Sequence, residues 1–294
     1  MALSIKNYIG KFTASQLDAF QQYLDCEANY EKFFGHSEEP SLSYDDYERQ
    51  KFQELIDKIN RVPFSSEAAD KGSCLNEIID CIILGVPSTR QDISIHSRKI
   101  YIKRDISGIV NPANGKVEGG DVEEYAIDLP HIEAVKGDNV FLFDVGFCKR
   151  LAAYFRGSLC QIYTEAPIDT KYGKVLLYGY PDYVRGNKVY DLKTTAKYEF
   201  GKYSKYWQRH LYPYTLIESG KMTEVSSFEF SAFQMKGGTA RSPLIYGEMY
   251  PEEYVYDHDR STVALRGICE QFCDFLLNNR DLITDKKIFG GQKD

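Results

Sequence analysis

A short stretch near the middle of the chain, VLLYGYPDYVRGNKVYDLKTT (Val175–Thr195), places two carboxylates opposite each other. Two runs rich in β-branched and aromatic residues flank the dipeptide Gly186-Asn187, which suits a two-residue hairpin turn. With this turn the register sets Asp182 directly opposite Asp191. Like charges in such a pair destabilise a hairpin. Pro181 has no N–H for the next rung, so the strands are expected to separate there and the carboxylates to diverge.

A lysine follows on the same face of the predicted hairpin. Lys193 lies two residues beyond Asp191, and alternate strand residues point the same way. A divalent cation would relieve the repulsion between the two carboxylates, and oxygen ligands of this kind suit Mg²⁺ or Mn²⁺. The simpler alternative is a solvated polar face on an exposed hairpin. The apolar residues Leu177, Val189 and Leu192 favour an inner strand instead.

Three short motifs follow one another along the chain: Gly179-Tyr-Pro-Asp182, Asp191-Leu-Lys193 and Gln208-Arg-His-Leu-Tyr212. Together they resemble the PD-(D/E)XK nuclease superfamily, particularly its RecB-like and phage-exonuclease branches. The resemblance implies an α/β fold with a restriction-endonuclease-like core, made of a helix, a three-stranded antiparallel hairpin sheet, a helix and a strand. Helical N-terminal and C-terminal additions and an inserted β-hairpin region are expected around it.

The resemblance also implies an activity and its residues. It implies a Mg²⁺- or Mn²⁺-dependent deoxyribonuclease, an exonuclease in phage or mobile-element DNA recombination or processing. Asp182, Asp191 and the main-chain carbonyl of Leu192 would hold the metal. Lys193 lies close to both carboxylates and should stay protonated, so it would stabilise charge rather than act as a general base. Substrate contacts would come from Thr194, Thr195, Gln208, Arg209 and Tyr212.

A further carboxylate is predicted from a helix before the hairpin. Ser66 is a suitable N-cap and Gly85 a stop signal, so this helix is expected to run to Ile83. Glu77 lies at the edge of its apolar face and is expected to reach the site as a catalytic residue and metal ligand. Asp80, expected to point further towards solvent, is the alternative. The predicted apolar face comprises Cys74, Leu75, Ile78, Ile79 and Ile82.

Charge is unevenly distributed along the chain. The net charge of −7 argues against broad non-specific nucleic-acid binding. The segment Val184–Lys221, however, contains eight basic and only three acidic residues, interleaved with many aromatic residues. Such a segment is typical of a groove that follows a phosphate backbone and stacks bases. We therefore expect DNA to lie along it, near Lys202, Lys205 and Arg209.

Composition limits the other partners and the compartment. The seven cysteines are odd in number and stand mostly in apolar contexts, which indicates free thiols in a reducing, cytoplasmic compartment. No apolar run approaches the ~20 residues that span a bilayer, so no membrane association is expected. An iron–sulfur cluster is not expected either. The resembling nucleases that carry one place three cysteines close together after the core, and only Cys269 and Cys273 follow it here. A homo-oligomer or a recombination partner protein is left open.

The pattern of elements divides the chain into a helical cap at 1–62, a nuclease core at 63–257 and a C-terminal helix and tail at 258–294. An insertion at 88–140 carries turn signals at 111–115 and 119–120. The alternative function is a nuclease-fold nucleic-acid-binding protein without catalysis, because Asn76 stands where RecB-like enzymes place a histidine. Helices are predicted at Ser15–Leu24, Tyr44–Ile59, Asp144–Phe155, Lys202–Ser219 and Ser261–Leu277, and further strands at Leu159–Ile168, Val225–Gln234 and Leu244–Tyr250.

Overall fold

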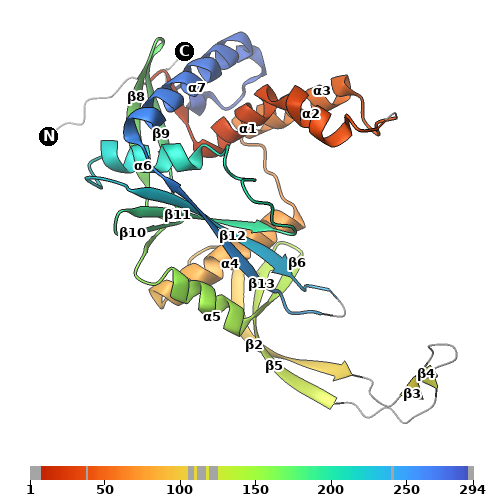
Figure 1. The fold of residues 1–294 in the computed structure, drawn as a ribbon. Helices are drawn as coiled ribbons and strands as arrows, with labels where there is room; N and C mark the ends of the chain where they lie inside the picture. The colour runs from red at the N-terminus through yellow and green to blue at the C-terminus, as the bar shows by residue number, and fades with distance from the viewer. Residues whose placement is uncertain are drawn as a thin grey trace.

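The structure, a computed structural model, describes residues 8–37, 39–104, 109–110, 117–118, 125–239 and 242–290. These residues form a mixed α/β protein (Figure 1). In chain order the elements are β1 (Gly10–Phe12), α1 (Ala14–Leu24), α2 (Cys26–Phe34), α3 (Tyr44–Ile59), α4 (Glu67–Leu84), β2 (Ser94–Arg104), β3 (Ile109–Val110), β4 (Val117–Glu118), β5 (Tyr125–Lys136), β6 (Asn139–Asp144), α5 (Val145–Tyr154), β7 (Leu159–Cys160), β8 (Thr164–Thr170), β9 (Gly173–Gly179), β10 (Tyr183–Arg185), β11 (Lys188–Thr195), α6 (Gln208–Glu218), β12 (Ser227–Lys236), β13 (Tyr246–Val255) and α7 (His258–Asn278).

A five-stranded sheet in the order β13-β12-β11-β10-β7 occupies the centre of the molecule. Strands β11 and β12 run parallel and are connected through α6, whereas the other pairs in this sheet are antiparallel. Helices α1, α6 and α7 lie on one side of the sheet and α4 and α5 on the other (Figure 1). Smaller sheets are β1-β9-β8, in which β1 pairs parallel with β9, and β2-β5-β6.

Two hydrophobic cores cover the two faces of the central sheet. Successive strand residues point to opposite faces, so Val184 packs into the core under α6 and α7, and Tyr183 into the core under α4 and α5. The first core also holds β1 and α1 through Phe12 and Leu17. The N-terminal region is thus joined to the rest by a strand and by packed side chains.

Several predicted elements are confirmed together with their caps. Helix α4 begins after Ser66, whose hydroxyl accepts the Ala69 N–H, and ends at Gly85 in the left-handed region at φ 69°. Helix α3 has the predicted bounds, and α5 is capped by Asp144. The prediction for the buried face of α4 is wrong at one position, because Ile82 is 38% exposed.

Two predicted strands are each divided between sheets. The run Val175–Val184 breaks at residues 180–182, so β9 belongs to the three-stranded sheet and β10 to the central one. Leu159–Ile168 breaks in the same way into β7 and β8, next to Gln161, which adopts a positive φ of 49°. The predicted helix from Lys202 starts only at Gln208, after a run of turns. Strand β1 and helix α2 were not predicted.

The predicted insertion is a long hairpin at its base. Strands β2 and β5 pair antiparallel from Ser94↔Val135 to Arg104↔Tyr125. Ile132 and Ala134 of β5 are buried in the core beside α4 and α5, so the base of the hairpin is part of that core. The turn signals at 111–115 and 119–120 lie outside the described residues, as do residues 1–7 and 291–294 of the terminal regions. None of the described helices has the length and apolar character needed to cross a membrane.

Candidate functional site

The hairpin of β10 and β11 has the predicted register, with Tyr183↔Tyr190, Val184↔Val189 and Arg185↔Lys188 around the Gly186-Asn187 turn. The ladder stops there, and Asp182 lies just beyond it. One carboxylate oxygen of Asp182 accepts the Leu192 N–H at 2.8 Å. The other accepts the side-chain amide of Gln161 at 3.0 Å. The Asp182 carboxylate therefore takes the place of a main-chain carbonyl at the open end of the hairpin.

Asp191, Lys193 and Gln208 form a closed set of polar contacts on the side of the sheet that faces α6. Asp191 is buried, and its Oδ2 lies 2.6 Å from Nζ of Lys193. Its Oδ1 accepts the Gln208 side-chain N–H at 2.7 Å, and Lys193 donates to Oε1 of Gln208 at 2.5 Å. Gln208 is the first residue of α6, so the helix start fixes how the carboxylate and the ammonium lie.

Burial sets the electrostatics of these groups. It raises the pKa of Asp182 to about 7, with the Asp191 charge adding to the effect and Lys193 opposing it. Burial likewise raises the pKa of Asp191 against the pull of Lys193. For Lys193, burial alone would lower the pKa, but the neighbouring carboxylates, Asp191 first, outweigh it and the pKa is raised. Lys193 is therefore an ammonium group at neutral pH.

A further carboxylate comes from α1, which lies in the predicted helical cap. Asp18 on α1 accepts the Trp207 N–H, immediately before α6, at 2.6 Å. Burial raises the pKa of Asp18 to about 7, with Lys193 lowering it and Asp191 raising it. Its only signal in the sequence is a charged residue next to the buried Leu17, which is too weak to identify it. Three aspartates thus share one lysine.

The prediction that Asp80 points further towards solvent than Glu77 is wrong. Asp80 is buried at 9% exposure, although it was expected to point towards solvent. Burial raises the pKa of Asp80 to about 6, and Tyr183 and Gln161 partly offset this effect. Gln161 also holds Asp182, so Asp80 approaches the open end of the hairpin. Glu77 is half-buried and contacts the thiol of Cys81, on the same helix.

The predicted substrate-binding residues are only partly brought together. Tyr212 lies close against Gly179, where a methyl group would meet its ring at 2.7 Å, so the glycine is required by this packing. Thr194 points to Gly72 of α4 on the opposite side of the sheet. Thr195 donates to the Lys197 carbonyl at 2.7 Å. Arg209 stacks over Tyr254 instead of facing Asp191, with its guanidinium carbon 4.9 Å from the ring centre.

The residues at this end of the hairpin fit a small divalent cation. Among the described residues, no group of three or more His, Cys, Asp or Glu side chains is arranged to hold a metal. Mg²⁺, however, is usually held by one or two carboxylates with water and substrate phosphates completing its shell. Asp182 and Asp191 supply that number. Burial raises the pKa of both carboxylates, and the Asp191 charge adds to this effect on Asp182, so a bound cation would favour their charged forms.

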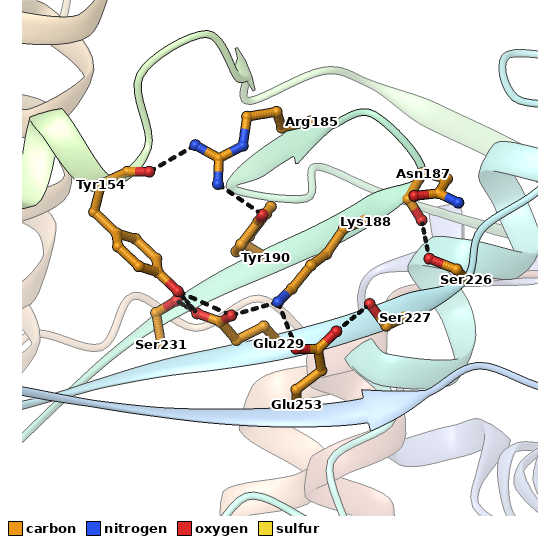
Figure 2. A network of polar contacts seen from close by, with 10 residues as sticks. All are labelled: Tyr154, Arg185, Asn187, Lys188, Tyr190, Ser226, Ser227, Glu229, Ser231 and Glu253. Atoms are coloured by element: carbon orange, nitrogen blue, oxygen red, sulfur yellow. Dashed lines mark hydrogen bonds and ion pairs between the residues drawn. The ribbon is translucent and has the colours of Figure 1, made fainter.

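The turn end of the same hairpin is held by a separate polar network (Figure 2). Lys188 bridges the carboxylates of Glu229 and Glu253 at 2.7 and 2.8 Å. Glu229 is buried and also accepts from Tyr154 and Ser231. Each buried group in this set has a partner, so the network anchors the hairpin on β12 and β13.

Comparison with known proteins gives little to add to this geometry. No protein-family model and no curated protein matches the chain. One solved structure, titled "Crystal structure of SSO0001", is similar over 42% of this chain at 12% sequence identity, with a TM-score of 0.28. The chain spans about half of that structure's length, since 55% of it is covered. A likeness of this size carries no argument about fold or function.

Proposed function

We propose that this protein is a metal-dependent nuclease that hydrolyses phosphodiester bonds in DNA. The observation that carries the proposal is the open end of the β10–β11 hairpin, where Asp182 and Asp191 lie beside a single lysine. A buried excess of carboxylates is unfavourable for folding alone. It is useful where a cation and a phosphate are to be bound.

The arrangement of elements supports a restriction-endonuclease-like core. Helix α4 precedes the strands, the β10–β11 hairpin carries both aspartates, and α6 connects β11 to the parallel strand β12. The proposed core differs from the expected one in that β9 and β10 lie in different sheets. The proposed site lies at the break between them.

In this proposal Asp182, Asp191 and the Leu192 carbonyl hold the metal, with Asp80, which shares Gln161 with Asp182, as a further carboxylate. When bound, Mg²⁺ or Mn²⁺ would polarise the phosphoryl group and lower the pKa of a bound water. Lys193 is kept charged by its carboxylate neighbours and stabilises negative charge that develops on the phosphate oxygens. Gln208 contacts both Asp191 and Lys193 and holds them in a fixed relation.

The basic and aromatic residues near α6 support a nucleic-acid substrate. Lys202, Lys205 and Tyr206 line a cavity of about 140 Å³ against the polar face of α1, next to Asp18. Lys205 forms an ion pair with Asp25 at 2.8 Å, so α1 forms one wall of the proposed groove. An exonuclease acting in phage or mobile-element DNA recombination, alone or with a second copy or a partner protein, remains our proposal for its biological role.

The test is cleavage of end-labelled DNA in Mg²⁺, Mn²⁺ and excess EDTA by the full chain and by Asp191→Asn. We expect cleavage only with metal, and loss of cleavage in Asp191→Asn. Asp169→Asn, on an exposed residue of β8, is the matched control and should cleave normally. Cleavage that persists in EDTA, or full activity of Asp191→Asn, would overturn the proposal. DNA binding without any cleavage would favour a non-catalytic binding protein.

A further inference from the structure

A second polar pocket lies where the first turns of α6 and α7 meet strands β12 and β13. It has a volume of about 180 Å³ and is lined on its polar side by Arg209, His210, Asp257, Arg260 and Ser261. Among the described residues, no hydrogen bond or ion pair joins this group to Asp191 or Lys193, whose polar partner on α6 is Gln208. Gln208 and Arg209 are neighbours on α6, and successive helical side chains diverge by about 100°. The helix thus presents one side chain to the proposed catalytic site and the next to this pocket.

Arg209 carries a charge that the protein does not compensate. Its guanidinium stacks on Tyr254, and its Nε is buried without a hydrogen-bond partner among the described residues. No ion pair joins Arg209 or Arg260 to a carboxylate in the part of the chain that the structure describes. Burial lowers the pKa of Arg209, and the Arg260 charge adds to this effect. A partly buried arginine without a carboxylate partner favours the binding of an anion.

The remaining groups in the pocket do not supply that anion. Asp257 is the only carboxylate that lines it among the described residues, and its Oδ1 accepts the Arg260 N–H at 2.9 Å as the N-cap of α7. The ring of His210 contacts the hydroxyl of Ser261 at 2.9 Å. Burial, with both arginines, lowers the pKa of His210 to about 4, so it is neutral at pH 7. The start of α7 adds the partial positive charge of a helix N-terminus.

We infer that this pocket binds a phosphate group through the guanidinium groups of Arg209 and Arg260. Planar guanidinium groups bind phosphate oxygens with paired, charge-assisted hydrogen bonds, and Arg209 and Arg260 both line the pocket without an ion pair to a carboxylate among the described residues. The phosphate belongs to the backbone of a nucleic-acid strand that also reaches the site at Asp191. This last assignment rests on the proposed function, whereas the phosphate site itself rests on the pocket.

The first experiment measures inorganic phosphate binding by thermal unfolding and calorimetry, in EDTA and at constant ionic strength. Phosphate should raise the Tm of the native chain and of the control Arg150→Gln, an exposed arginine on α5. Phosphate should not raise the Tm of Arg209→Gln or of Arg260→Gln. Arg260 is exposed, so its substitution leaves the core intact. Without phosphate, Arg209→Gln should be at least as stable as the native chain. An equal response in all four proteins, or none in the native chain, would overturn the site.

The second experiment measures binding of a short single-stranded oligonucleotide in EDTA across a range of salt concentrations. Loss of one phosphate contact reduces the slope of log K against log salt by about 0.7 for single strands. We expect that reduction in Arg209→Gln and Arg260→Gln but not in Arg150→Gln. If the variants lose the phosphate response but bind the oligonucleotide as the native chain does, the pocket serves a free phosphate compound and the nucleic-acid assignment is wrong. Neither readout needs cleavage, so failure of the proposed nuclease activity would be seen separately.

Discussion

The carboxylate of Asp182 accepts the main-chain N–H of Leu192 at 2.8 Å and so ends the ladder between β10 and β11. A residue predicted as a metal ligand therefore also satisfies a buried backbone group. In the absence of metal, these two roles are separable by substitution, because an amide side chain keeps an oxygen acceptor and a methyl group does not.

We expect Asp182→Ala to lower the free energy of unfolding by about 1–3 kcal/mol, because it leaves the Leu192 N–H without an acceptor. Asp182→Asn keeps an acceptor and removes a buried charge, so its stability should match or exceed that of the native chain. Both variants should lose cleavage. Urea unfolding in EDTA checks this prediction, and equal destabilisation of the two variants would contradict the role of the hydrogen bond.

The second prediction concerns α4. Asp80 is buried near Asp182 and Gln161, whereas Glu77 contacts Cys81 on its own helix. Asp80→Asn should therefore reduce metal-dependent cleavage by at least about tenfold, the lower end of what loss of a group supporting a metal site costs. Glu77→Gln should have a smaller effect. A metal titration of both variants decides the order, and a larger defect in Glu77→Gln would restore the assignment made from the sequence.

Gln208 gives a third prediction, because it binds both Asp191 and Lys193 without carrying a charge. Gln208→Ala should lower kcat by about 10–100-fold through misplacement of these two groups, with little change in KM. Gln53→Ala, which removes an exposed amide from α3, is the control and should retain kcat. Steady-state kinetics on a labelled oligonucleotide separates the two parameters. A change confined to KM would show that Gln208 contacts substrate instead.

Asp18 makes stability depend on pH in a defined direction. Its pKa is about 7 in the folded protein, against about 4 in an unfolded chain. Between these values the folded state binds more protons, so the contribution of Asp18 to stability is fully present below pH 4 and is lost as pH rises to 7. Asp18→Asn keeps an acceptor for the Trp207 N–H. In EDTA it should be more stable than the native chain at pH 8 and equal at pH 4, and a constant difference across this range would contradict the assignment.

The parts of the fold that local sequence could predict are those set by neighbouring residues. The Gly186-Asn187 turn fixes the register of the hairpin, and Ser66 and Gly85 fix the ends of α4. The inward position of Asp80 was not predictable, because a helical wheel records one apolar face and α4 buries residues on more than one side.

Contacts between residues far apart in the sequence account for the remaining differences between the predicted and the observed fold. Nothing near Gly10–Phe12 indicates that these residues pair with β9, more than 160 residues later. Pro181 lacks an N–H, so the sequence predicts that strand pairing is interrupted there. That β9 and β10 belong to different sheets depends on the strands with which each one pairs. The approach of Asp18 to Lys193 follows from the packing of α1 on the core and has no local signal.

The break between β9 and β10 determines when during folding Asp182 reaches its final position. Leu177, before the break, packs in the core that contains α7, and Tyr183, after it, packs in the core under α4 and α5. Asp182 lies between them and is placed only when both cores have formed. Because α7 follows every strand of the central sheet in the sequence, the core that holds Leu177 is completed only after all these strands have been synthesised. The proposed site at Asp182 therefore forms late in folding.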